Sequence, residues 1–195
     1  MQKRLFAAVK IEPDQNFISL YSYLKSIWKE HKINWVPLNN MHITFHFFGD
    51  TEEKIIPDIS EQLKDAVHNI PVFEIGISNF GIFGSSYKPR VIWMGINQNE
   101  NINVLSNNIA HNLSKIGYIP DRQNFVPHLT IGRIKYINDK KLFQKQLDGV
   151  KDKFVQSFVA DRLYLFESIL NSEGPTYHII ETFCFNNMND KRLLF

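Results

Sequence analysis

The chain of 195 residues carries 22 basic and 20 acidic side chains, a formal net charge of +2, and 44% of its residues are hydrophobic. This composition predicts a globular protein with a sizeable core and excludes a disordered or low-complexity chain. The near balance of charge excludes a protein that grips a long nucleic-acid backbone through a strongly basic face, whereas contact with a ligand through one phosphate is compatible with it.

The apolar segments are too short for a signal peptide or a membrane span. The single cysteine, Cys184, lies between Phe183 and Phe185, and it cannot form an intrachain disulfide. We therefore expect a cytoplasmic protein in which Cys184 is a buried, unreactive thiol.

Alternating and helical patterns of apolar residues predict the elements of the first half of the chain. The expected elements are strands at 3–11 and 42–49, an amphipathic helix at 17–31 and a loop rich in Pro and Asn at 35–41. A second helix is expected to begin near Thr51, with Pro57 as a kink or as the sign of a later start.

The second half continues with short strands and two helices. The expected strands span 73–77, 91–96, 129–134, 158–166 and 177–185, the helices span 102–116 and 139–147, and a turn-rich connection spans 79–89. Several neighbouring strands are joined by loops too short for the crossovers that parallel strands need. The pattern therefore predicts an α+β fold with antiparallel or mixed sheets. Since no flexible linker divides the chain, we expect residues 1–195 to form one domain with two closely packed lobes.

Two short segments of the chain resemble each other. Each consists of a histidine, an apolar residue, a threonine and a second apolar residue, with His42 and Thr44 in the first segment and His128 and Thr130 in the second. Side chains two residues apart on a strand point to the same face, about 7 Å apart along the backbone, so each segment offers an imidazole and a hydroxyl to one ligand. With seven histidines in the chain, two such pairs are rare by chance, and two structural histidines are the alternative.

These residue types suit the hydrolysis of a phosphodiester. The reaction needs a base that takes a proton from water and an acid that protonates the departing oxygen, and histidine can do either near neutral pH. Threonine hydroxyls can donate to the charge that builds on the non-bridging oxygens. A zinc site is disfavoured because His42 and His46, four residues apart, would lie about 13 Å apart on a strand. We therefore predict catalysis by His42 and His128 without a metal or another cofactor.

The chain resembles the two-histidine phosphoesterases, and within them the RNA 2′,3′-cyclic phosphodiesterases, formerly described as bacterial and archaeal 2′-5′ RNA ligases. The paired motifs are specific to the superfamily, and the segments around them favour this branch. The resemblance rests on RLFAAV (4–9), HITFHFFGD (42–50), PRVIWMG (89–95), FVPHLTIGR (125–133) and LYLFES (163–168), followed by Gly174 and Tyr177.

The resemblance implies a bilobal α+β fold with pseudo-two-fold symmetry, in which two sheets flanked by helices each present one His-x-Thr motif to a central cleft. It implies that a 2′,3′-cyclic phosphate, on an RNA end or a nucleotide, is opened to a 2′-phosphomonoester. His42 would be the acid for the leaving 3′ oxygen and His128 the base. Neither a membrane nor a stable protein partner is implied. The alternatives are a phosphoesterase for another nucleotide, such as a 2′-5′ oligonucleotide or an ADP-ribose cyclic phosphate, and an RNA-end-binding module without turnover.

Three further residues are candidates for contact with the substrate. Arg133 helps to bind phosphate in this family, but it follows His128 by five residues, so a regular strand would turn it away from the cleft. Gly132 indicates a bulge or a strand end that would redirect Arg133, and a surface or lobe-packing arginine is the alternative. Trp35 or Phe48 could stack on a base, although packing in the core or in the cleft wall is favoured.

Overall fold

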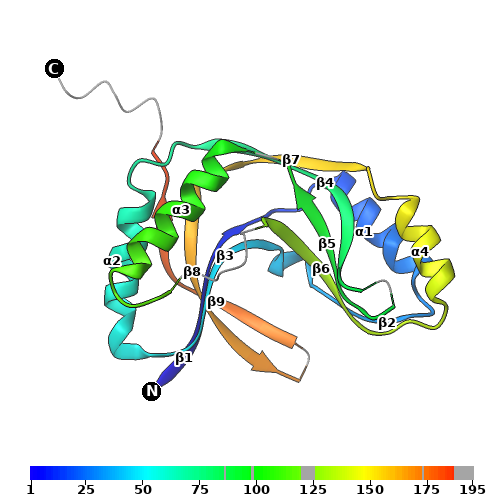
Figure 1. The fold of residues 1–195 in the computed structure, drawn as a ribbon, viewed down its shortest axis with the longest axis horizontal. Helices are drawn as coiled ribbons and strands as arrows, with labels where there is room; N and C mark the ends of the chain where they lie inside the picture. The colour runs from blue at the N-terminus through cyan, green and yellow to red at the C-terminus, as the bar shows by residue number, and fades with distance from the viewer. Residues whose placement is uncertain (86, 98, 120–125, 173, 187–195) are drawn as a thin grey trace.

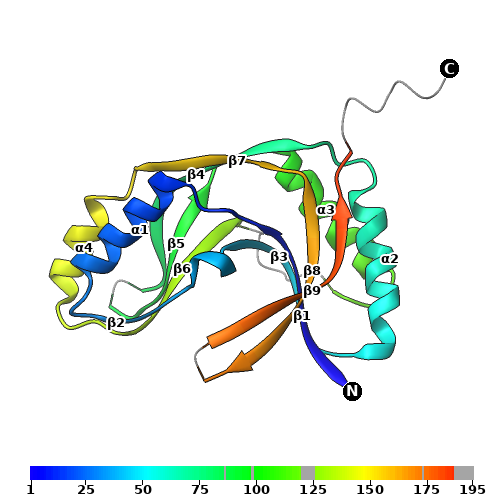
Figure 2. The same cartoon turned by 180° about the vertical axis from the view of Figure 1, so that it is seen from behind.

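The structure is a computed structural model that describes residues 1–85, 87–97, 99–119, 126–172 and 174–186. Within these residues, nine strands form one sheet in the order β7-β4-β5-β6-β3-β1-β8-β9, and β2 pairs with β6 beside this path. All pairings between these strands are antiparallel. The sheet curls into a half-barrel with helices at both ends (Figures 1 and 2).

Strands and helices alternate irregularly along the chain. The strands are β1 (Gln2–Lys10), β2 (Lys32–Trp35), β3 (His42–Glu52), β4 (Phe73–Gly84), β5 (Pro89–Ile96), β6 (His128–Tyr136), β7 (Phe154–Ala160), β8 (Arg162–Asn171) and β9 (Gly174–Cys184). The helices are α1 (Gln15–Ile27), α2 (Ile56–Val67), α3 (Glu100–Ser114) and α4 (Lys140–Asp148), with 3-10 helices η1 (Leu38–Asn40) and η2 (Glu53–Ile55). Side-chain caps fix several helix starts: the Asp14 carboxylate accepts from the Phe17 amide at 2.8 Å at the start of α1.

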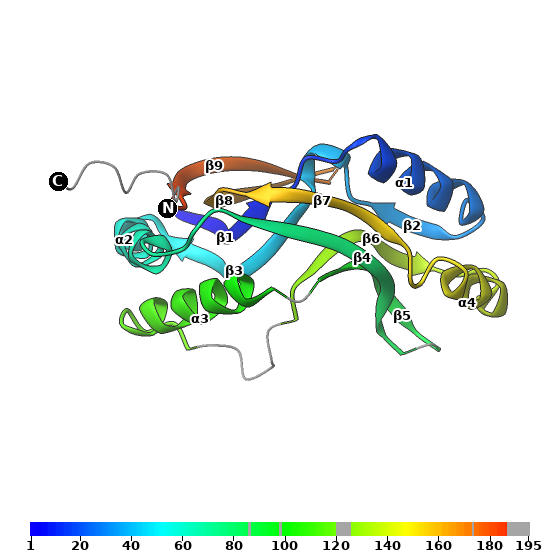
Figure 3. The same cartoon turned by 90° about the horizontal axis from the view of Figure 1, so that it is seen from above.

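The strand order is symmetric about the contact between β3 and β6, which we call the seam. Outward from the seam, β6 is followed by β5, β4 and β7, and β3 is followed by β1, β8 and β9. The helices cross over: α1 follows β1 in the chain but lies with α4 beside β5, whereas α3 follows β5 but lies with α2 at the opposite end (Figures 1 and 3). The two halves therefore repeat one arrangement, and each brings one His-x-Thr strand to the seam.

The two faces of the sheet are packed differently. Leu5, Ala7 and Val9 of β1 belong to the large core that also receives the apolar stripes of the helices. Phe6 and Ala8 alternate with them and point to the opposite face. There they form a second, small cluster, whose other members are Phe166, Tyr164 and Tyr177. This face carries the candidate site.

The predicted α+β class, with antiparallel strands flanked by helices, is confirmed. The two expected sheets join into one because the two motif strands pair with each other at the seam. The expected strand at 158–166 is two strands, β7 and β8, which pair with β4 and β1 on different halves. The chain changes direction at Asp161, whose carbonyl accepts from the Phe185 amide at 2.7 Å.

Three local expectations also differ from the structure. β4 continues to Gly84 where turns were expected, because Asn79, with a φ of 63°, occupies an irregularity within the strand rather than a turn. Thr51 lies in β3, and α2 begins later, with Pro57 in its first turn, as one of the two interpretations of Pro57 predicted. Cys184 is exposed, since the neighbouring Phe183 and Phe185 point inward. In the described part of the chain, no helix is long and apolar enough to cross a membrane.

Candidate active site

The register of the seam brings the two motifs together. β3 and β6 pair at Ile43 and Leu129, which are both fully buried. In an antiparallel pair, the residues flanking this position lie opposite each other, so His42 faces Thr130 and Thr44 faces His128. All four side chains project from the face opposite to the buried pair. They line one cleft with a volume of about 640 Å³.

Both imidazoles are held by a backbone carbonyl two residues earlier in the chain. Nδ1 of His42 lies 2.7 Å from the Asn40 carbonyl oxygen, and Nδ1 of His128 lies 2.9 Å from that of Val126. A carbonyl oxygen can only accept, so Nδ1 carries the hydrogen in both rings. Nε2 is thereby left to act on a ligand, as an acceptor when the ring is neutral and as a donor when it is protonated.

A β-bulge follows each motif. On β3, Thr44 pairs with Ala8 and His46 with Ala7, so Phe45 is an extra residue. On β6, Thr130 pairs with Trp93 and Gly132 with Ile92, so Ile131 is an extra residue. An extra residue reverses the alternation of the side chains that follow it.

The bulges return the fifth residue after each histidine to the cleft. Arg133 follows His128 by five residues and Phe47 follows His42 by five, and both line the cleft. The bulge in β6 is the kind of irregularity that Gly132 indicated. Across the pseudo-two-fold axis, Arg133 therefore corresponds to Phe47, so one half contributes a cation where the other contributes an aromatic ring.

The aromatic residues considered for base stacking divide between the cleft and its surroundings. Trp35 lines the cleft, with its ring against those of Tyr21 and Trp28. Phe48 does not line the cleft, because its ring packs on His46 at 4.6 Å and on Tyr118. The bulge at Phe45 exposes Phe47 in the cleft instead, where 53% of its surface is accessible.

Burial and nearby positive charges both act on the pKa of His42. Burial lowers the pKa of His42 below its usual value, the hydrogen bond to Asn40 opposes this, and the positive charges of Arg133 and His128 lower the pKa further. The rings of Phe6 and Tyr177 lie 4.9 Å and 5.3 Å from the His42 ring. These effects together favour the neutral form of His42.

The charge of the cleft suits an anion. Among the described residues, no Asp or Glu lines the cleft, whereas two imidazoles and the Arg133 guanidinium do. The described residues also contain no group of three or more His, Cys, Asp or Glu side chains that could hold a metal ion. His46 lies outside the lining of the cleft, and burial lowers its pKa.

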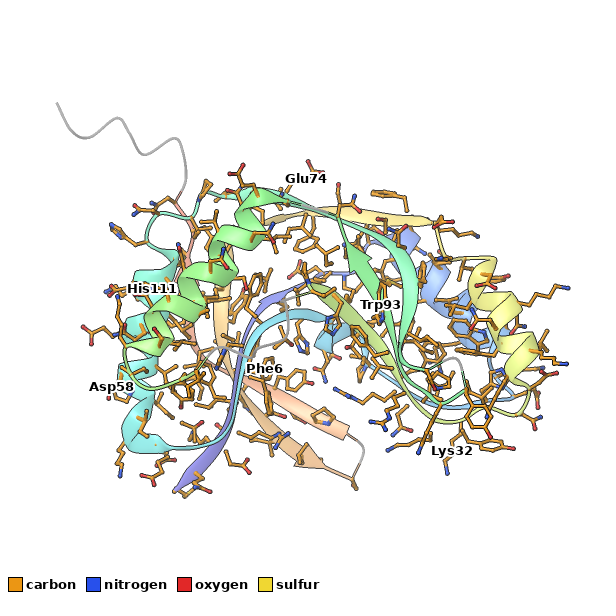
Figure 4. The ribbon with its side chains drawn as sticks, viewed as in Figure 1. Phe6, Lys32, Asp58, Glu74, Trp93 and His111 are labelled. Atoms are coloured by element: carbon orange, nitrogen blue, oxygen red, sulfur yellow. The ribbon has the colours of Figure 1, made fainter. Side chains whose placement is uncertain are left out.

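The structure adds residues that the sequence did not single out. The Asn40 side chain donates to the Pro175 carbonyl at 2.9 Å, which ties the β8–β9 hairpin to the segment that orients His42. Pro175 and Tyr177 of this hairpin line the cleft. Figure 4 shows Phe6 on β1, near the hairpin, and Trp93 on β5, on the other side of the seam. Because the second motif has Val126 where the first has Asn40, the similarity of the motifs gave no signal for this tie.

Comparison with known proteins identifies relatives of the chain. The sequence matches the 2′-5′ RNA ligase superfamily over residues 8–169. A Thermotoga maritima protein named RNA 2′,3′-cyclic phosphodiesterase is 34% identical over 146 residues, which are 75% of this chain and 76% of the relative. A Methanocaldococcus jannaschii protein of the same name is 33% identical over 181 residues, which are 91% of this chain and 98% of the relative.

Solved structures share the fold. A Thermus thermophilus protein, TT0787, superposes with a TM-score of 0.78 at 20% identity, over 95% of this chain and 99% of that one. E. coli LigT complexed with 3′-AMP superposes over the same shares with a TM-score of 0.76 at 18% identity. The chain belongs to the 2′-5′ RNA ligase superfamily.

Proposed function

We propose that the protein is an RNA 2′,3′-cyclic phosphodiesterase, which opens the cyclic phosphate at an RNA end or on a nucleotide to a 2′-phosphomonoester. The observation that carries the proposal is the pair of imidazoles, His42 and His128, each held through Nδ1 and facing one cleft beside two hydroxyls and a guanidinium. The names of the relatives from Thermotoga maritima and Methanocaldococcus jannaschii support the choice of substrate.

In the proposed reaction, water attacks phosphorus while one imidazole accepts a proton from it at Nε2. The bond between phosphorus and O3′ breaks, and the other imidazole donates its Nε2 proton to O3′. One water is consumed, and the products are a 2′-phosphate and a free 3′ hydroxyl. Thr44, Thr130 and Arg133 donate to the non-bridging oxygens as charge builds on them. The two imidazoles and Arg133 supply both proton transfers and the positive charge, so we assign no role to a metal.

The order of the two histidines rests on opposing effects. The family resemblance makes His42 the acid, whereas burial favours the neutral form of His42. A bound phosphate anion beside His42 favours the protonated ring and opposes the effect of burial. We therefore assign His42 as the acid and His128 as the base.

The identity of the product tests the reaction. RNA oligonucleotides ending in a 2′,3′-cyclic phosphate should yield ends that resist a 3′-specific phosphatase and that a general phosphatase dephosphorylates. A 3′-phosphate product would mean that O2′, not O3′, is the leaving group. Binding of the oligonucleotide without turnover would support an RNA-end-binding module instead.

Removal of metal ions tests the assignment of all chemistry to side chains. Turnover should be unchanged after exhaustive EDTA treatment and desalting, since no step is assigned to a metal. Loss of turnover that zinc or magnesium restores would contradict the metal-independent mechanism.

A further inference from the structure

A second hollow, with a volume of about 260 Å³, adjoins the cleft at His42; we call it the side hollow. Asn40, His42 and Tyr177 line both spaces, so the side hollow borders the cleft. Lys10, Phe166 and Ile179 are among the residues that line the side hollow but not the cleft. The proposed chemistry does not use this space.

Lys10 is placed beside His42 by the sheet itself. It pairs with His42 across β1 and β3, and directly opposed residues on antiparallel strands point to the same face. The Lys10 side chain is exposed, and within the described residues no carboxylate forms an ion pair with it. By contrast, Lys3 on the same strand is paired with Glu167 at 2.9 Å. The ammonium of Lys10 is therefore available to a ligand.

The charges around the side hollow continue those of the cleft. The chain has 20 acidic residues, yet among the described residues none lines either space. The cations are Arg133 in the cleft and Lys10 in the side hollow, with the two imidazoles near the seam. On its other side Lys10 borders a hollow that Glu12 and Asp161 line, but within the cleft and the side hollow the two separated cations suit a ligand that carries more than one phosphate.

The side hollow also has an apolar wall. The ring of Phe166 packs on Phe6 at 5.1 Å, and the Phe6 ring contacts Tyr177 at 4.9 Å. Ile179 is 54% exposed although it is apolar. Aromatic and apolar surface next to a cation is the combination that single-stranded RNA uses, because each nucleotide presents a base or sugar face together with a phosphate.

We propose that the side hollow binds the second nucleotide from the RNA end, and that Lys10 contacts the phosphodiester that joins it to the terminal nucleotide. This inference rests on the proposed function, which puts the cyclic phosphate of the terminal nucleotide between His42 and His128. The substrate class is then an oligonucleotide rather than a mononucleotide, and Lys10 determines this preference.

Steady-state kinetics with two substrates test the proposal. A nucleoside 2′,3′-cyclic monophosphate is compared with a dinucleotide that has the same terminal base and ends in a 2′,3′-cyclic phosphate. The wild-type protein should have the higher kcat/KM for the dinucleotide. Lys10→Met should lower the ratio of the two kcat/KM values by roughly tenfold, because a charge-assisted contact to phosphate is lost. Lys10→Arg should retain the preference.

The salt dependence and a control lysine sharpen the test. For the dinucleotide, Lys10→Met should reduce the slope of log kcat/KM against log salt concentration by about 0.7, the value for one phosphate contact on a single strand. Lys64→Met, on the exposed face of α2, removes the same charge elsewhere and should match the wild type.

The outcomes separate the side hollow from the reaction. Equal kcat/KM for both substrates in the wild type, or an equal loss on both in Lys10→Met, would overturn the second-nucleotide site while leaving the proposed reaction intact. Absence of turnover with both substrates would contradict the proposed reaction, and the second-nucleotide site with it.

Discussion

His42 and His128 have the same motif and the same kind of backbone tether, but their surroundings differ. His42 is partly buried against two aromatic rings, and the positive charge of Arg133 acts on it. His128 has the Phe83 ring at 4.7 Å, in an edge-on contact. The pseudo-symmetry of the motifs therefore does not make the surroundings of the two imidazoles equivalent.

Replacement of either histidine should cripple turnover. His42→Ala and His128→Ala are each expected to lower kcat by about 10²–10⁴-fold, and the double variant should lose far less than the product of the two factors, because the pair acts as a unit.

The pH dependence of turnover tests which histidine is the acid. With His42 as the acid, kcat/KM falls as pH rises through the lowered pKa of His42, so the fall should begin below pH 6.5, the usual value. His42→Ala should lose this alkaline limb and His128→Ala the acidic limb. Loss of the acidic limb in His42→Ala would reverse the roles.

The threonines should matter less than the histidines. Thr44→Ala or Thr130→Ala removes one donor to the transition state, worth about 2–4 kcal/mol by analogy with an oxyanion-hole donor, and this should appear in kcat. Thr51→Ala is a control on β3, the strand that also carries Thr44. Thr51 is buried away from the cleft, and its hydroxyl donates to the Gly49 carbonyl at 3.2 Å. It should lower stability without changing kcat. An unchanged rate in both cleft variants would mean that the phosphate lies elsewhere.

The elements show what apolar patterning predicts and where it stops. Alternation and helical spacing placed the strands and helices, because burial of one face imposes those periods. Which face of the sheet each side chain points to is harder to predict, because a bulge reverses the alternation. Gly132 indicates a bulge before Arg133, but no glycine marks the bulge at Phe45. The sequence therefore makes Phe48 a candidate for stacking, whereas Phe47 lines the cleft. The break between β7 and β8 is hard to see in the sequence because apolar segments lie on both sides of the short charged pair Asp161 and Arg162.

The tie between η1 and the β8–β9 hairpin lies beyond any local pattern. Asn40 and Pro175 are separated by 135 residues, and only the pairing of β1 with both β3 and β8 brings them together. The hydrogen bond closes the hairpin over the segment whose carbonyl orients His42. The hairpin should therefore influence the titration of His42.

Asn40→Ala tests this influence, because it removes the donor to Pro175 but keeps the carbonyl that orients His42. We expect kcat to fall by roughly tenfold, and the pKa of His42 to rise towards 6.5 as the hairpin detaches and burial decreases, which moves the alkaline limb to higher pH. Asn108→Ala is the matched control: its side chain donates to the Ala66 carbonyl at 3.1 Å, far from the cleft. A shift of the limb in the control as well would show a general loss of structure.

For the whole molecule, the family resemblance implied two lobes with one motif each, and the strand order is symmetric about the seam. The sequence does not predict that the two lobes share one sheet. This depends on the pairing of β3 with β6, in which Ile43 lies opposite Leu129, 86 residues later in the chain. The assignment of residues 1–195 to a single domain stays a prediction.

The stability of the molecule should depend on pH through two partly buried histidines, His42 and His46. Burial lowers the pKa values of His42 and His46 below 6.5, so the unfolded chain takes up protons before the folded chain does as pH falls. The free energy of unfolding should therefore decrease below pH 6.5, and these two groups should contribute no slope well above it. Thermal unfolding at about pH 7.5 and pH 5.5 measures the effect, which His46→Gln should reduce. His111→Gln, at an exposed position on α3, should leave it unchanged; equal curves for wild type and His46→Gln would contradict the prediction.

The seam also determines how the two halves of the molecule are joined. β1 and β3 are in register along nearly the whole of β1, whereas among the described residues β3 and β6 register only at Ile43 and Leu129. Within the described part of the sheet the two halves are therefore joined at this one point of register, and the large core that both halves share completes the connection. Each half carries one imidazole together with its own orienting carbonyl. The distance between the two imidazoles therefore depends on the seam and on the shared core, whereas the orientation of each ring is set within its own half.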